Sequence, residues 1–117
     1  MGTFLFIVSY TNGSWARMIR RHDDRTAALT SLLETYGGSL ERVAWDVESL
    51  TAYAVAGLHD AVTAAAVRTA VAQTGAFSSV EVHELLSQEQ LSDVLVMARD
   101  GSNVYKAPGY ADAVADS

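Results

Sequence analysis

Side chains suited to acid–base chemistry recur at every second position in two short stretches of this sequence, residues 40–48 and 77–86. Because successive side chains of a strand point to opposite faces, alternate residues share one face. If the valines and tryptophan of these stretches face a core, the other face carries five polar residues: Arg42, Asp46, Glu48, Glu81 and His83. The same alternation adds Ser9 and Tyr53 from two further predicted strands. The sequence thus predicts a base, a carboxylate, a guanidinium and a phenol on one sheet surface.

A histidine paired with a carboxylate is suited to proton transfer on a carbonyl compound. Histidine gains and loses a proton near neutral pH, so His83 is the candidate general base. Asp46 or Glu81 would orient it, while Arg42 or Tyr53 would stabilise an enolate oxygen. These five residues are the predicted catalytic set. Substrate contacts are expected from four more residues: Ser9, Trp15, His22 and Glu48.

The same side chains have a second interpretation that involves no chemistry. Four of them could form an ion-pair network where two subunits meet: Arg42, Asp46, Glu81 and His83. A shift of one residue in strand register would also move every side chain to the other face. Trp15 and Trp45 are most simply core residues. His22 is expected at the core edge or surface, although its helix could border the mouth of a pocket.

Metal and covalent chemistry have no support in the sequence. The chain has no cysteine, and its three histidines lack metal-binding spacing. No serine lies in a G-x-S-x-G context. No metal or cofactor is therefore expected, and haem ligation by a single histidine has no local motif behind it.

Length and charge limit the classes of partner. The chain has 117 residues, a net charge of −6 and 50% hydrophobic residues, as in one folded acidic domain. This charge argues against nucleic acid and anionic membranes as partners. The apolar run 4–8 is too short to span a bilayer and lacks the features of a signal peptide, so a cytoplasmic location is expected.

Periodicity and turn signals predict the elements that must position these residues. Strands are expected over residues 3–10, 40–48, 51–58 and 77–86. One helix is expected from an N-cap at Ser14 to Tyr36, with a polar break at residues 23–25 and an end at Gly37-Gly38. A second follows the cap Asp60 to residue 74. A short third begins with the Ser87–Gln90 capping box and reaches Ala98.

This order predicts an α+β domain, the ferredoxin-like β-α-β-β-α-β fold with an extra C-terminal helix. The domain is expected over residues 1–98. Residues 99–117 are expected to form a tail that is disordered or acts as a lid through Tyr105, Lys106 and Tyr110.

In this fold both helices cover one face of the sheet. The other face would expose five large apolar side chains: Leu5, Ile7, Tyr53, Val55 and Leu85. Since monomers rarely expose such a patch, we expect the same face of a second copy to cover it. The predicted state is a homodimer whose two sheets enclose a chamber.

Several segments resemble the GYD-domain family of dimeric α/β-barrel proteins. They are residues 4–11, the helix that ends in Gly37-Gly38, Trp45, and the Leu85-Leu86-Ser87-x-Glu89-x-Leu91 segment. The resemblance covers about residues 3–98. The signature glycine, tyrosine and aspartate of that family are replaced here by Glu48, Leu50 and Thr51, so roles tied to them do not carry over. The family implies no single activity, because related barrels include cyclases, isomerases, cofactor-free monooxygenases and haem enzymes.

Two classes of function remain open. The first is a cofactor-independent enzyme of cyclase or isomerase type, acting on a hydrophobic carbonyl compound such as a polyketide-like intermediate, with a cofactor-free monooxygenase as a variant. The second is a non-catalytic homodimer that binds a small ligand or serves as an interaction module.

Overall fold

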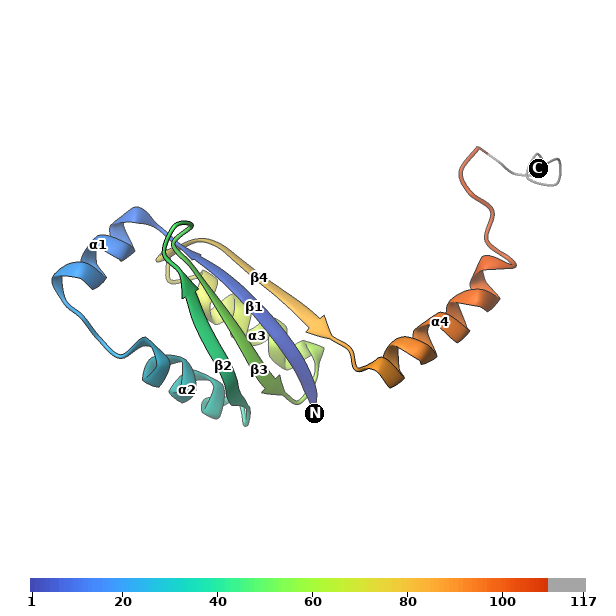
Figure 1. Ribbon diagram of the computed structural model, residues 1–117, viewed down its shortest axis with the longest axis horizontal. Coiled ribbons are helices and arrows are strands. Elements are labelled where there is room, and N and C mark those ends of the chain that lie inside the picture. Colours follow the sequence, from blue (N-terminus) through green and yellow to red (C-terminus); the bar gives the residue numbers. More distant parts are fainter. Residues whose placement is uncertain (110–117) are drawn as a thin grey trace. The chain divides into compact units, whose positions relative to one another are not determined.

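The computed structural model describes residues 1–109 of the chain. In order, the elements are β1 (Gly2–Tyr10), α1 (Asn12–Arg20), α2 (Arg25–Thr35), β2 (Ser39–Asp46), β3 (Thr51–Leu58), α3 (Ala61–Ala72), β4 (Phe77–Leu85) and α4 (Gln88–Ser102) (Figure 1). The four predicted strands are confirmed. The chain divides into two compact units, of which the first is Met1–Leu85 and the second begins at Leu86.

The strands of the first unit form one antiparallel sheet in the order β2-β3-β1-β4. β1 and β3 occupy the centre, so β2 and β4 are the two edges. This is the strand order of the ferredoxin-like fold, and it confirms the predicted α+β class.

One face of the sheet carries the core. From β1 it contributes Phe4, Phe6, Val8 and Tyr10, which are buried, whereas the residues between them are only partly covered. Leu33 of α2 and Val67 of α3 pack into the same cluster. α2 lies mainly over β2 and α3 mainly over β4. The helices therefore cover one face at its two edges, as the topology predicts.

The single helix predicted from Ser14 to Tyr36 is wrong, because two helices occupy this span. Thr11 is the N-cap of α1, since its hydroxyl oxygen accepts a hydrogen bond from the amide of Ser14 at 3.1 Å. Ser14 instead donates its hydroxyl proton to the carbonyl of Ala76 at 2.7 Å. Asp24 starts α2 by accepting from the amide of Ala27 at 3.0 Å. A polar break with a capping aspartate ends one helix and begins another.

The predicted strand 40–48 ends two residues early, at Asp46. Val47 was expected to face the helices, but it lies in the turn between β2 and β3 and is 66% exposed. Asp46 holds this turn, accepting from the amide of Glu48 at 3.0 Å and from the hydroxyl of Ser49 at 2.9 Å. Leu50 completes it with a φ of 54°, in the left-handed region.

The caps predicted at Asp60 and Ser87 are confirmed, as are the glycine signals after α2 and α3, although α3 ends at Ala72 and not at residue 74. Gly37 and Gly75 have φ values of 73° and 77° after α2 and α3, a conformation that glycine adopts without strain. Asp60 caps α3, and the hydroxyl and amide of Thr63 that bond its carboxylate hold its pKa below the ordinary value. The Ser87–Gln90 capping box is present.

The second unit contains α4, which reaches Ser102 and so extends beyond the helix end expected at Ala98. The domain boundary that the sequence favours after residue 98 falls inside this helix. The lid role expected of Tyr110 lies outside the described residues. Within residues 1–109, no helix is long and apolar enough to cross a membrane.

Candidate functional site

The face of the sheet that the helices leave uncovered, called the open face below, carries the predicted catalytic residues. The register places them in three cross-strand rows. The first is Arg42, Val55, Leu5 and His83; the second is Ala44, Tyr53, Ile7 and Glu81; the third is Asp46, Thr51, Ser9 and Ser79. Directly opposite residues of antiparallel strands point to the same face. The alternation read from the sequence therefore assigned these side chains to the correct common face.

Glu81 and His83 form the one catalytic pair that the described chain brings together. Nε2 of His83 lies 3.2 Å from Oε1 of Glu81. Both side chains are more than half exposed, at 53% for His83 and 56% for Glu81. The pair lies on the edge strand β4, two residues apart on one strand face. Glu81 is thus positioned to orient His83, as the sequence predicts.

Asp46 cannot orient His83 within one chain, and this alternative is wrong there. Asp46 lies on β2 and His83 on β4, which are opposite edges of the sheet. Three strand spacings separate these edges, or about 14 Å. The carboxylate of Asp46 also holds the turn described above. Arg42 shares the β2 edge and lies in the same row as His83, so the three strand spacings also separate these two residues.

The predicted substrate residues separate into two groups. Ser9 lies on the open face, where its hydroxyl is 3.1 Å from that of Thr51. Glu48 does not, because it follows the end of β2 and lies in the turn. Trp15 and His22 also lie elsewhere, beside a shallow hollow of about 410 Å³ that Trp45 and Arg25 line as well. His22 is exposed and lines this hollow, and its role in binding a substrate stays a prediction.

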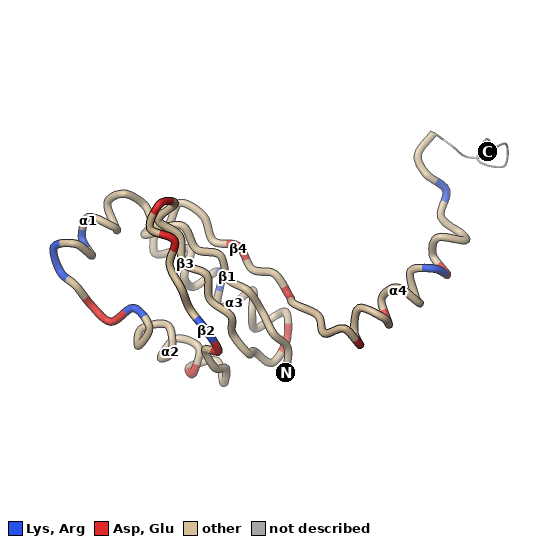
Figure 2. Tube along the Cα trace, in the orientation of Figure 1, with Lys and Arg blue, Asp and Glu red and all other residues tan. Residues whose placement is uncertain are grey.

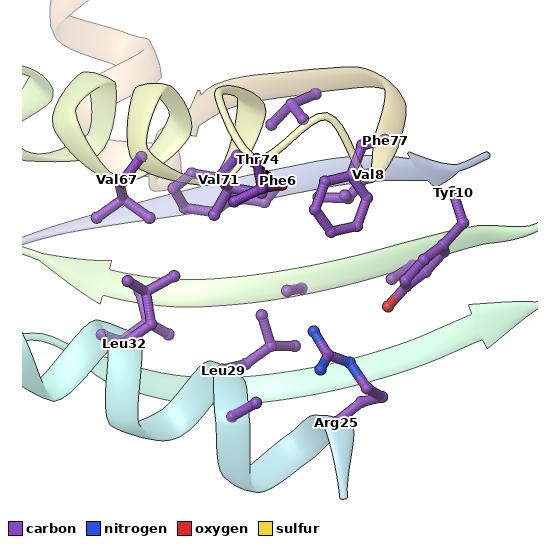
Figure 3. Close-up of a pocket in the computed structure, with 16 residues that line it drawn as sticks. Phe6, Val8, Tyr10, Arg25, Leu29, Leu32, Val67, Val71, Thr74 and Phe77 are labelled. Carbon is purple, nitrogen blue, oxygen red and sulfur yellow. Dashed lines mark hydrogen bonds between the residues drawn. The ribbon is translucent and has the colours of Figure 1, made fainter. Parts of the chain in front are cut away.

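A second and more enclosed pocket lies between α2, α3 and the core face of the sheet. Its volume is about 230 Å³. Figure 3 shows side chains of both helices and of the strands surrounding this space. Lining residues include Leu29 and Leu32 of α2, Val67 and Val71 of α3, and Phe6 and Ala54 of the sheet. We call this space the helix-side pocket.

The strand order and the small residues of β3 explain the helix-side pocket. α2 and α3 lie over opposite edge strands, about 14 Å apart, whereas helices in direct contact are 8–10 Å apart. The space between them lies over β1 and β3. There β3 presents Ala52, Ala54 and Ala56 to the core face, and these short side chains leave the gap unfilled. The alternating alanines are the sequence signal that could have indicated the pocket.

One end of the helix-side pocket is polar. Arg25, the first residue of α2, donates from Nη1 to Oδ2 of Asp23 at 3.0 Å, while its Nε is buried without a hydrogen-bond partner. Tyr10 lies at the same end (Figure 3), and its hydroxyl accepts from Nε1 of Trp45 at 3.4 Å. Burial lowers the pKa of Arg25, but hydrogen bonds with Asp23 and Tyr10 outweigh it, so the pKa lies above its ordinary value. The guanidinium is charged.

Positive charge gathers around this end. Four of the eight Lys and Arg residues of the chain lie in residues 17–25: Arg17, Arg20, Arg21 and Arg25. Figure 2 shows them at the end of α1 and the start of α2, on either side of Asp23 and Asp24. Arg17 and Arg21 line a hollow of about 300 Å³ that also contacts Tyr10 and Arg25. In this acidic protein, the Arg25 end of the helix-side pocket is locally basic.

Groups of three or more His, Asp or Glu residues in a metal-binding arrangement are absent from residues 1–109.

A family model described as GYD domain matches residues 4–95 of the chain. No curated protein and no solved structure matches the chain. The family match covers the sheet and both helices that line the helix-side pocket.

Proposed function

This chain belongs to the GYD domain family, and because its fold alone selects no activity, we propose its function from its pockets. The proposed protein is a homodimer that binds a small apolar molecule in the helix-side pocket. The observation that carries this proposal is the largely apolar pocket of about 230 Å³ between α2, α3 and the sheet. Ligand sites are mostly apolar cavities with a few polar groups that orient the ligand. We also propose a cytoplasmic location, since a domain without cysteine needs no oxidising compartment.

The size of the pocket sets the size of the ligand. A cavity of about 150 Å³ holds benzene, with its six carbons. At the same ratio, a space of about 230 Å³ holds about nine non-hydrogen atoms. 1-Octanol has nine such atoms and is a suitable neutral probe.

Filling the pocket should abolish binding of 1-octanol. Ala70 of α3 lines the pocket, and Ala70→Phe adds a phenyl ring that would occupy about two thirds of it. Binding is measured by titration calorimetry and by the fluorescence of Trp15 and Trp45. The control is Ala66→Phe, which adds the same ring at an exposed position of the same helix. Unchanged binding by a folded Ala70→Phe protein, shown by circular dichroism, would reject the site.

The homodimer in this proposal rests on the open face. Leu5 and Ile7 lie at its centre, and Tyr53 and Leu85 are each 41% exposed. A two-fold axis parallel to the strands would lay the β2 edge of one copy over the β4 edge of the other. Arg42 would then face the row of His83 in a second copy and lie one row from Glu81, whose charge is opposite. Pairing of this kind would enclose the Glu81–His83 pair.

The 3.2 Å contact between Glu81 and His83 favours a second candidate function, acid–base catalysis of cyclase or isomerase type on a hydrophobic carbonyl compound. In an enclosed chamber, His83 would remove a proton adjacent to the carbonyl group, and Glu81 would stabilise the imidazolium. A cofactor-free monooxygenase would begin with the same proton removal.

His83→Ala should lower the rate of this proton removal by about 100-fold or more, the usual contribution of a positioned base. The rate is followed by NMR as exchange of the methyl protons of acetophenone in D₂O. His59→Ala is the matched control, since His59 is exposed and lies just before the cap of α3. Catalysis by His83 is excluded if the variant exchanges these protons as fast as the wild type.

A further inference from the structure

The helix-side pocket combines an apolar interior with a single charged end. Its interior is lined by leucine, valine, phenylalanine and alanine side chains. Arg25 and Tyr10 close one end, and Figure 3 shows the guanidinium and the phenol hydroxyl on the same side of the space. Such a pocket distinguishes the two ends of a ligand.

The hydrogen bonds of Arg25 leave one strong donor unused. Nη1 is bonded to Asp23 at 3.0 Å, but Nε is buried and has no partner. A buried polar group without a hydrogen bond is unfavourable, so a small movement of the Arg25 side chain that brought Nε to an acceptor would stabilise the protein. Nε and a terminal nitrogen of a guanidinium form the planar edge that binds carboxylates.

The surrounding charges favour an anionic acceptor. Arg17 and Arg21 line the adjoining hollow with Arg25, and Asp23 is the acidic residue that lines it. A carboxylate beside Arg25 would therefore lie in a region of net positive charge (Figure 2). The net charge of the whole chain is −6, so this attraction is local to the pocket mouth.

We propose that the natural ligand of the helix-side pocket is an amphipathic carboxylic acid of about nine non-hydrogen atoms in all, with a carboxylate that binds Arg25. This inference rests on the proposed function, because it requires the pocket to bind small molecules. It adds the chemical class of the ligand and the residue that recognises it. Tyr10 donates a second hydrogen bond to the carboxylate.

The test compares octanoate with 1-octanol, two probes with the same chain length and different head groups. Wild-type protein should bind octanoate about 10- to 100-fold more tightly than 1-octanol, the gain of a charge-assisted hydrogen bond. Arg25→Met keeps an apolar stem but removes the charge. It should lose the preference for octanoate while its affinity for 1-octanol stays within about twofold. Affinities are measured by calorimetry, with the fluorescence of Trp15 and Trp45 as an independent readout.

Arg20→Met is the matched control, because it removes a nearby arginine that does not line the pocket or its adjoining hollows. It should retain the preference of the wild type. If Arg25→Met does not fold, Arg25→Lys keeps the charge without the planar edge and should reduce the preference by about tenfold.

Each outcome has one meaning. Equal affinity of the wild type for octanoate and 1-octanol overturns the carboxylic-acid proposal and leaves the pocket as a ligand site. Binding of neither probe overturns the proposed function itself. A preference for octanoate that persists in both Arg25→Met and Arg25→Lys assigns recognition of the carboxylate to another residue and also overturns the inference.

Discussion

Replacing Phe4 with alanine should lower the free energy of unfolding by about 3–5 kcal/mol, the usual effect of removing a large buried aromatic side chain. Phe4 is 2% exposed and lies on the central strand β1. It is one of the two largest fully buried side chains of the described chain, with Leu58. Its ring packs where the sheet meets the helices, so its loss opens a cavity in the middle of the core.

The size of this effect also follows from what surrounds Phe4. The neighbouring core-face residues Ala54 and Ala56 are too small to move into the cavity. The midpoint and slope of urea unfolding, at one fixed protein concentration, give the change. Val62→Ala is the control, because Val62 is 78% exposed and its truncation should change stability by less than about 0.5 kcal/mol. A loss below about 1 kcal/mol for Phe4→Ala would contradict the core described here.

Leu5→Lys should convert the proposed homodimer into folded monomers. Leu5 lies on β1 and points away from the helices, next to Val55 and His83 in the cross-strand register. In a monomer the lysine would extend into water at little cost. In the dimer, two ammonium groups would be buried without partners, at about 3–5 kcal/mol each. The dissociation constant should rise by about 10⁴-fold or more.

Sedimentation at micromolar concentration measures this change. The wild type and the control Val62→Lys, on the exposed surface of α3, should sediment at twice the 12.5 kDa of one chain. Leu5→Lys should sediment as a single chain with unchanged circular dichroism. A wild type that sediments as a 12.5 kDa species would reject the dimer, and with it the enclosed Glu81–His83 pair. The helix-side pocket would be unaffected, because its lining comes from one chain.

The helix-side pocket and the Glu81–His83 pair lie on opposite faces of the same sheet. Alternate residues of β1 contribute to each, with Phe6 lining the pocket and Ile7 lying beside Glu81. Substitutions on one face therefore leave the side chains of the other in place. Ala70→Phe and His83→Ala test the two candidate functions independently.

Local features of the sequence predicted the elements and the face on which each strand residue lies. Alternation along a strand is a property of neighbouring residues, so Glu81 and His83 were correctly expected to share a face. The caps at Asp60 and Ser87 and the helix end at Gly37 depend on a few adjacent residues, so the sequence also predicted them correctly. The same kind of local signal gave a wrong N-cap at Ser14. The Ser14 hydroxyl instead donates to the carbonyl of Ala76, which is 62 positions away in the sequence.

What the sequence by itself determined, then, is the order of the elements and the alternation that groups the open-face residues. The tertiary structure decided which of those residues are close enough to act together. Strand order placed Asp46 and His83 at opposite edges, about 14 Å apart, and left Glu81 as the partner of His83. It also held α2 and α3 apart above the alanines of β3, forming a pocket with Arg25 at its end. These outcomes depend on which strands pair and on the distances between packed elements, which no local pattern of residues contains.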